Sequence, residues 1–121
     1  MPCPYVIHTA RHAPTVSMRD IGAFMIRHVV LFRFVPSATV AQIAGARSAL
    51  IGLKGVIPEV REIGFGPNYG PSAGDWPWVL CATCDDMPAV GRYLAHPAHV
   101  DAVNRFVVPI REARLAVDFE T

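Results

Sequence analysis

The sequence is poor in charged residues, and those it has are not clustered. Charged residues make up 17% of the 121 residues, and the formal net charge is +1 at pH 7. A chain without a basic run lacks the electrostatic footprint of nucleic-acid binding, so we expect no nucleic-acid partner. No apolar run approaches the ~18 residues that a membrane-spanning helix needs, so we expect no membrane partner and a cytoplasmic protein.

Apolar residues, in contrast, are abundant for a chain of this length. Hydrophobic residues make up 52% of the sequence. A single domain of this size leaves much of its surface exposed if it stays monomeric. The excess of apolar residues therefore predicts a buried interface between subunits.

Cysteines are too few for a disulfide framework, since the sequence has only three: Cys3, Cys81 and Cys84. Cys81 and Cys84 have the spacing of a redox or metal-binding pair, but the residues around them predict a strand. Residues three apart in a strand point to opposite faces, so these two cannot easily share an ion or form a bridge. We interpret them as structural residues, because free cysteine is often a small buried hydrophobe.

The first 24 residues differ from the rest of the chain. They combine prolines, histidines and arginines without the sustained period of a strand or a helix. We therefore predict a poorly ordered leader over residues 1–24 and one domain over residues 25–121, and we expect the domain to fold without the leader. The alternative is an arm that packs on a partner subunit.

The remaining sequence predicts four strands and three helical segments. β-Branched and aromatic residues predict strands over Ile26–Val35, Val60–Gly66, Trp78–Cys84 and Leu115–Phe119. Apolar residues at helical spacing predict one helix over Val40–Gly52, a second that follows Asp85 and Asp86 and ends at about Leu94, and a third over about Ala98–Val107. Pro97 separates the last two, because the residue before a proline avoids the helical conformation.

This order is β-α-β-β-α-β, the ferredoxin-like split motif of the α+β class. Four antiparallel strands with the helices on one face leave the other face of the sheet bare. An exposed apolar sheet face needs a partner, and the simplest partner is a second copy related by a two-fold axis. We therefore predict a homodimer through the sheet face, in which two sheets form a dimeric α/β barrel.

Two imidazoles and a phenol lie around Pro97: Tyr93, His96 and His99. The unperturbed pKa of imidazole lies near neutrality, so a Tyr–His pair can exchange protons at pH 7. His28 adds a third imidazole near the start of the first expected strand. The two histidines beside Pro97 could share a metal ion, but only Asp101 lies near as a third ligand, so we predict no metal and no cofactor.

Two segments of the sequence resemble a known family. They are His28–Phe34 in the first expected strand and Tyr93–Val100 in the second helical region. In sequence, order and separation they resemble the stress-responsive A/B barrel (Dabb) family of small dimeric α+β proteins, and the resemblance covers residues 26–121. In a plant branch of this family, the olivetolic acid cyclases, a tyrosine and two histidines serve the aldol closure of a linear polyketide.

The resemblance places those three positions at Tyr93, His99 and His28. It implies that neutral His99 takes a proton from an activated methylene and that Tyr93 hydrogen-bonds the developing enolate or alkoxide, while His28 orients the substrate. Further contacts with a small-molecule substrate are expected from Val30, Phe32 and His96.

The same residues also have a purely structural interpretation. The histidines can cap helix ends or bond backbone carbonyls, and Tyr93 can be a core aromatic with a satisfied hydroxyl. The sequence therefore leaves two functions open. One is a cofactor-free lyase or cyclase acting on a small polyketide-like or aromatic substrate, and the other is a non-catalytic dimeric domain that is stress-associated or binds a small ligand.

Overall fold

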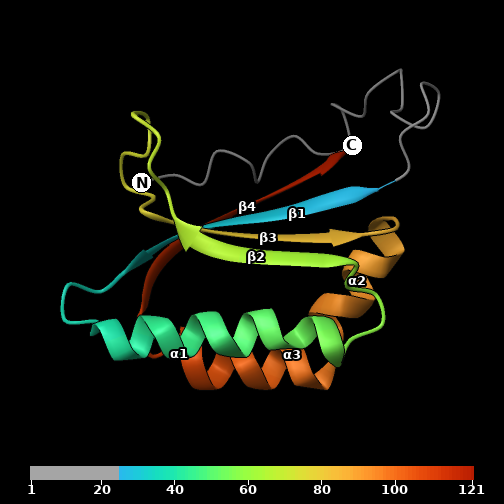
Figure 1. Ribbon diagram of the computed structural model, residues 1–121, viewed down its shortest axis with the longest axis horizontal. Coiled ribbons are helices and arrows are strands. Elements are labelled where there is room, and N and C mark those ends of the chain that lie inside the picture. Colours follow the sequence, from blue (N-terminus) through green and yellow to red (C-terminus); the bar gives the residue numbers. More distant parts are fainter. Residues whose placement is uncertain (1–24) are drawn as a thin grey trace.

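The computed structural model describes residues 25–121, so the expected leader over residues 1–24 lies outside the described residues. The described chain runs in the order β1-α1-β2-β3-α2-α3-β4 (Figure 1). The strands are β1 (Ile26–Phe34), β2 (Glu62–Pro67), β3 (Trp78–Cys84) and β4 (Arg111–Glu120). The helices are α1 (Val40–Ile51), α2 (Met87–Ala95) and α3 (Pro97–Ala102), with a 3-10 turn at Gly52–Gly55 and a π-turn at Val103–Val107.

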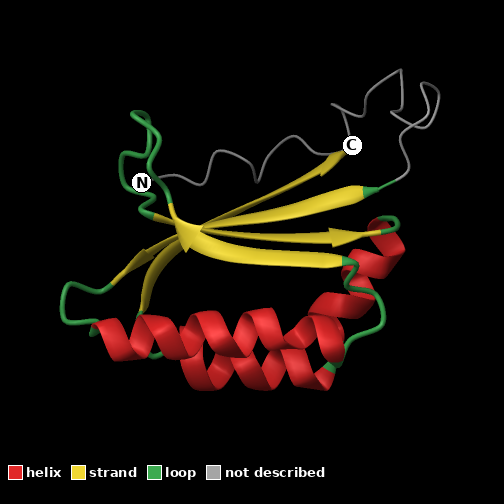
Figure 2. Cartoon of the chain, viewed as in Figure 1, coloured by secondary structure: helices red, strands yellow, loops and turns green. Residues whose placement is uncertain are grey.

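The arrangement of the strands confirms the ferredoxin-like α+β fold. The sheet has the order β2-β3-β1-β4, and every neighbouring pair of strands is antiparallel. The helices all lie on one side of the sheet, as Figure 2 shows. None of the helices within residues 25–121 is long and apolar enough to cross a membrane.

The central strand β1 shows why one face of the sheet is covered. Its buried residues alternate along the strand: Ile26, His28, Val30, Phe32 and Phe34. Since successive side chains of a strand point to opposite faces, these five form one row beneath the helices. His28 is the only polar member of an otherwise apolar row.

An aromatic cluster fills the space between the helices and one half of the sheet. The ring of Phe65 lies 6.5 Å from the ring of Phe34 and 5.8 Å from the ring of Trp78, and both pairs are stacked. Phe32 lies 6.2 Å from Phe65 at the margin of the cluster. Such aromatic pairs contribute ~0.5–1.5 kcal/mol beyond their area of burial. We call this part, formed by β2, β3 and these rings, the packed half.

The opposite face of the sheet carries no helix within residues 25–121 (Figure 2). By the alternation along each strand, it is formed mainly by apolar residues: Val29, Leu31, Val79, Cys81, Leu115, Val117 and Phe119. Val117 and Phe119 each expose 46% of their surface. The bare face therefore has the apolar character that the expected subunit interface requires.

The two cysteines of β3 behave as the strand pattern predicts. Cys84 is buried on the helix-covered face, while Cys81 lies on the bare face, and both are free thiols. Burial raises the pKa of the Cys84 thiol to about 11, so this group stays protonated near neutral pH. The two thiols thus lie on opposite faces of the sheet, as the strand pattern predicts.

Some element boundaries differ from the sequence-based expectation. β4 begins at Arg111 rather than Leu115, because its antiparallel pairing with β1 continues to Phe34. The strand therefore includes polar residues that its local sequence pattern does not predict. β2 begins at Glu62 rather than Val60, whose backbone N–H instead closes a turn with the carbonyl of Ile57 at 3.1 Å. The α-helical part of the last helix ends at Ala102. The π-turn follows it directly, and there the N–H of Val108 bonds the carbonyl of Val103.

Candidate functional site

A cavity of about 250 Å³ lies between the helix-covered face of the sheet and the segment from α2 to the π-turn. Its apolar walls come mainly from Val30, Phe32, Leu50, Leu80, Leu94, Val103 and Val107. Its polar lining consists of His28, Tyr93, His99, Arg111 and Arg114. A few polar groups that converge within apolar walls are typical of small-molecule sites.

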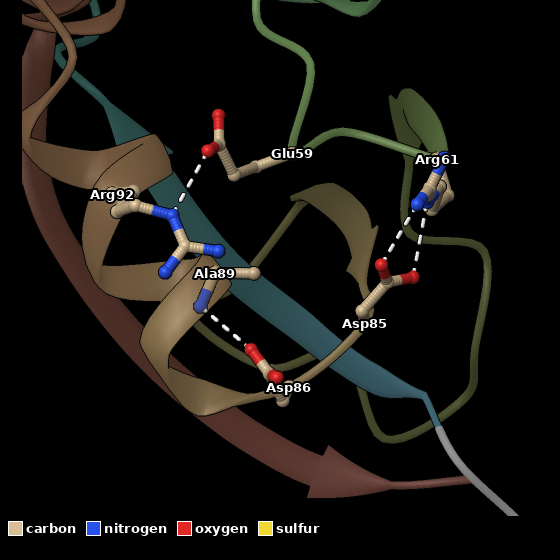
Figure 3. A network of polar contacts seen from close by, with 6 residues as sticks. All are labelled: Glu59, Arg61, Asp85, Asp86, Ala89 and Arg92. Atoms are coloured by element: carbon tan, nitrogen blue, oxygen red, sulfur yellow. Dashed lines mark hydrogen bonds and ion pairs between the residues drawn. The ribbon is translucent and has the colours of Figure 1, made fainter.

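The start of α2 is held in place by two aspartates at the end of β3 (Figure 3). Asp86 is the N-cap, and its carboxylate accepts a hydrogen bond from the backbone N–H of Ala89 at 2.8 Å. Arg61 donates two hydrogen bonds to the carboxylate of Asp85, at 3.0 and 2.8 Å. A carboxylate at an N-cap satisfies helix donors that would otherwise lack partners, so α2 begins at a defined point.

A second ion pair fixes the middle of α2. Arg92 donates a hydrogen bond to the carboxylate of Glu59 at 2.9 Å, and this bond lowers the pKa of Glu59 (Figure 3). Glu59 belongs to the loop before β2, so the pair ties α2 to a segment distant in sequence. Tyr93 follows Arg92 directly and turns inward from the helix, where its side chain is fully buried.

The hydroxyl of Tyr93 has no hydrogen-bond partner among the described residues. Buried hydroxyls are almost always hydrogen-bonded, because an unpaired one loses its bonds with water without replacement. Burial also raises the pKa of Tyr93 well above its usual value, so the phenol stays protonated at neutral pH. Tyr93, which lines the cavity, thus carries a hydroxyl whose hydrogen-bonding capacity is unused within residues 25–121.

His96 and His99 follow α2, and they have different tasks. The Nδ1 of His96 accepts a hydrogen bond from the backbone N–H of Ala98 at 3.0 Å and caps α3. Pro97 occupies the first position of α3, where its missing N–H costs nothing. The break between the helices turns the chain so that the ring of His99 lies 4.6 Å from the ring of Tyr93.

The environment of His99 selects one tautomer of its ring. Its Nδ1 lies 3.0 Å from the backbone carbonyl of Leu94. A carbonyl can only accept, so Nδ1 carries the hydrogen and Nε2 keeps a free lone pair. Burial lowers the pKa of His99 below its usual value; the hydrogen bond to Leu94 acts in the opposite direction, and electrostatic interactions with His28 and Arg114 lower the pKa further. A neutral ring with an available Nε2 is what a general base at pH 7 requires.

His28 reaches the same cavity from β1 and is paired across the sheet. Its Nδ1 lies 2.7 Å from a carboxylate oxygen of Asp118, which stands directly opposite on β4. Because a carboxylate accepts, Nδ1 is the donor of this bond, and Nε2 takes no part in it. The ring of His28 lies edge-on to Tyr93, with the centroids 6.2 Å apart. The ring of Tyr93 thus lies near both histidines.

The structure brings most of the sequence-predicted site residues around one cavity: His28, Val30, Phe32, Tyr93 and His99. His96 does not line this cavity, because its ring nitrogen is engaged in capping α3. For His96 the structural interpretation applies. For His99 it applies to one ring nitrogen only, and for Tyr93 the satisfied hydroxyl that it requires is absent from residues 25–121.

Sequence reasoning missed the polar residues that β4 contributes: Arg111, Arg114 and Asp118. The expected strand began only at Leu115, so both arginines fell in a loop. A signal was present in the alternation of Arg114, Ala116 and Asp118, which places all three on the face of His28 once the strands are paired. Within residues 25–121 we find no group of His, Cys, Asp and Glu side chains that could hold a metal ion.

Residues 26–121 match the family described as Stress responsive A/B Barrel Domain. Similar solved structures include a dimeric ferredoxin-like protein of unknown function from Thermobifida fusca, with 29% identity, a TM-score of 0.70 and coverage of 91% of this chain and 99% of that one. Another dimeric ferredoxin-like protein of unknown function, from Bacteroides fragilis, has 29% identity, a TM-score of 0.69 and coverage of 80% and 96%.

A hydroxynitrile lyase from Passiflora edulis has 18% identity and a TM-score of 0.73, with coverage of 82% of this chain and 94% of that one. At this identity the likeness concerns the fold alone. No curated protein matches the sequence.

Proposed function

The chain belongs to the stress-responsive A/B barrel domain family, and we propose that it is a cofactor-free lyase or cyclase that acts on a small aromatic or polyketide-like substrate. One observation carries the proposal. Tyr93 and His99 both line the cavity, where the hydroxyl of Tyr93 has no partner among residues 25–121 and the Nδ1–H of His99 bonds Leu94, so that Nε2 carries the lone pair of the neutral ring. A donor and a base at one cavity are the two groups that proton abstraction next to a carbonyl needs.

The proposed reaction begins with the transfer of a proton from carbon to nitrogen. Nε2 of His99 takes the proton of an activated C–H bond, and the bonding electrons move onto the adjacent carbonyl oxygen. Tyr93 donates its hydroxyl hydrogen bond to this oxygen as negative charge develops there. In a cyclase the enolate carbon then attacks a second carbonyl, and the resulting alkoxide takes the proton back from His99.

His28 supports this chemistry from β1. Its bond to Asp118 holds the ring in one orientation, much as a carboxylate orients the histidine of other acid–base sites. Its Nε2 can then accept a hydrogen bond from a hydroxyl group of the substrate. We assign His28 to orienting the substrate, and His99 to the proton transfer.

The size of the cavity limits the substrate. An engineered apolar cavity of ~150 Å³ binds benzene. A cavity of about 250 Å³ therefore accommodates one ring with short substituents rather than a long extended chain. The apolar walls formed by Val30, Phe32 and Leu80 suit an aromatic ring or a folded short polyketide.

The proposal includes a homodimer through the bare face of the sheet. That face is apolar, and Val117 and Phe119 expose nearly half of their surface on it. Exposed apolar patches of this kind mark interaction surfaces, and a two-fold axis lets the patch cover itself. The dimeric descriptions of the two structures at 29% identity support a second copy as the partner.

The test of the acid–base proposal is hydrogen exchange into a one-ring ketone. Phenylacetone carries an activated methylene beside a carbonyl, and its exchange in deuterated water can be followed by NMR. We expect the protein to accelerate the exchange, His99→Gln to lower the catalysed rate by about 10²-fold or more, and Tyr93→Phe to lower it by a similar factor.

His96→Asn is the matched control for this experiment. It removes a histidine three residues from His99, but asparagine is a favoured N-cap, so α3 keeps its start. We expect this variant to retain the wild-type exchange rate. A wild-type protein no faster than His99→Gln, or an equal loss in His96→Asn, would contradict the proposal.

A further inference from the structure

Two arginines of β4, Arg111 and Arg114, line the cavity. Most other arginines of the described chain bond to carboxylates, namely Arg33, Arg61, Arg92 and Arg105. Arg111 and Arg114 form no hydrogen bond or ion pair with any side chain of residues 25–121. Guanidinium groups beside an apolar cavity with no counter-charge make that end of it electropositive.

The two arginines lie at the edge strand, where the cavity meets the solvent. Arg111 is half-buried and Arg114 is exposed, whereas Tyr93 and His28 are buried at the inner end. The charge of Arg114 acts on the ring of His99, where it contributes to the lowered pKa. The arginines and the acid–base groups therefore face one space, with the charges at its mouth.

We propose that the substrate is a small aromatic carboxylate, whose carboxylate group binds Arg111 and Arg114. This inference rests on the proposed function, because the same cavity receives the ligand and the same His99 acts on it. The planar fork of a guanidinium matches a carboxylate in two parallel hydrogen bonds, which fixes orientation as well as charge. A ring anchored in this way extends inward along Val30 and Phe32.

Binding of the carboxylate to Arg111 and Arg114 also accounts for the separation of the cavity into a charged end and an acid–base end. A carboxylate at the mouth turns the opposite end of the ligand toward Tyr93 and His99, where the unused donor and base lie. The negative charge of the carboxylate is paired with the guanidinium groups, so the ligand enters without an unpaired charge of its own in the apolar part. A neutral ligand of the same shape would leave the arginines without a partner.

The test compares benzoate with benzamide, which has the same shape and no charge. Binding to the purified full-length protein is followed by NMR of the histidine ring protons. We expect benzoate to bind more tightly than benzamide, by roughly tenfold to a hundredfold, as hydrogen bonds to charged groups imply. Arg111→Gln and Arg114→Gln should each lower the affinity for benzoate by about tenfold and leave that for benzamide unchanged.

Arg105→Gln is the charge-matched control. Arg105 bonds Asp101 on the exposed surface and does not line this cavity, so its loss changes the net charge equally without touching the site. Equal affinity for benzoate and benzamide, or an equal loss of benzoate binding in Arg105→Gln, would overturn the proposal. Inorganic phosphate that binds as tightly as benzoate would overturn it too, because the aromatic ring would then contribute nothing.

The two proposals fail in different experiments. If phenylacetone exchange requires His99 but benzoate shows no advantage over benzamide, the carboxylate proposal fails and the acid–base function stands. If benzoate binding requires the β4 arginines while no exchange is catalysed, the cavity binds a carboxylate without acting on it. The second result would favour the non-catalytic ligand-binding domain.

Discussion

The helix-covered face of the sheet has two halves that follow the same strand alternation and differ in content. In the packed half, β2 turns Ile63 and Phe65 toward the helices, and aromatic rings fill the space between. In the other half, β4 turns Arg114, Ala116 and Asp118 toward the same side, next to the cavity. We call this second part, formed by β1, β4 and the cavity, the open half.

The charged residues on the inward face of β4 explain why the open half contains a cavity, whereas the packed half forms part of the core. Charged residues are rarely buried without a partner, so an edge strand that carries them on its inward face cannot close the core. Large apolar residues on the inward face of β4 would have extended the core and left no cavity. The polar residues of β4 therefore keep the open half from being filled, and the candidate acid–base groups lie in this half.

The largest expected effect of a single change lies in the packed half. Phe65→Ala removes a ring that stacks on Phe34 and Trp78, and we expect the free energy of unfolding to fall by ~3–5 kcal/mol. Urea denaturation at a fixed protein concentration measures the loss. Tyr69→Ala, at a site that is 89% exposed, is the control and should change the free energy by less than ~0.5 kcal/mol. A loss of under ~1 kcal/mol in Phe65→Ala would remove the distinction between the halves.

A second change tests the bare face against the helix-covered one. Val117→Glu places a charge in the proposed interface, and we expect the dissociation constant of the dimer to rise by at least about tenfold, or ~1.4 kcal/mol. Light scattering over a range of concentrations measures this shift. Val56→Glu makes the same change at an exposed position in the loop before β2 and should leave the dimer intact. A wild-type protein that scatters as a single chain at micromolar concentration would rule out the dimer.

The sequence predicts the fold well and the site incompletely, for a physical reason. The apolar row of β1 and the cap at Asp86 depend on neighbouring residues, so local patterns identify them. The length of β4 depends on its pairing with β1, which no local pattern contains. Arg111, Arg114 and the Asp118–His28 pair therefore escaped sequence reasoning, and they became visible only once the register of the two strands was known.

The third prediction concerns pH and the open half. Burial lowers the pKa of His99 below its usual value of 6.5, so the unfolded chain binds more protons than the folded one between these two pKa values. The contribution of neutral His99 to stability is complete above pH ~6.5 and declines as the pH falls below that value. We expect an NMR titration of His99 to give a midpoint below 6.5 and the catalysed exchange to decline at that same midpoint.

The variant Arg114→Gln tests the cause of the lowered His99 pKa. The charge of Arg114 is one of the causes that lower the pKa of His99, so its removal should move the midpoint up without reaching the usual value, because burial is the larger cause. Arg105→Gln, away from the cavity, should leave the midpoint unchanged. A His99 midpoint at or above 6.5 in the wild-type protein would show that the ring is not in the buried environment described.

The smallest expected effect on stability falls on the most buried group of the open half. Tyr93→Phe removes a hydroxyl that has no partner among residues 25–121, so we expect the free energy of unfolding to stay the same or rise by up to ~1 kcal/mol. Tyr69→Phe, at an exposed position, is the control and should have no effect. A loss of more than ~1 kcal/mol in Tyr93→Phe would mean that the fold uses the hydroxyl, as the structural interpretation requires. Unchanged stability together with slower exchange into phenylacetone would mean that the hydroxyl serves the substrate.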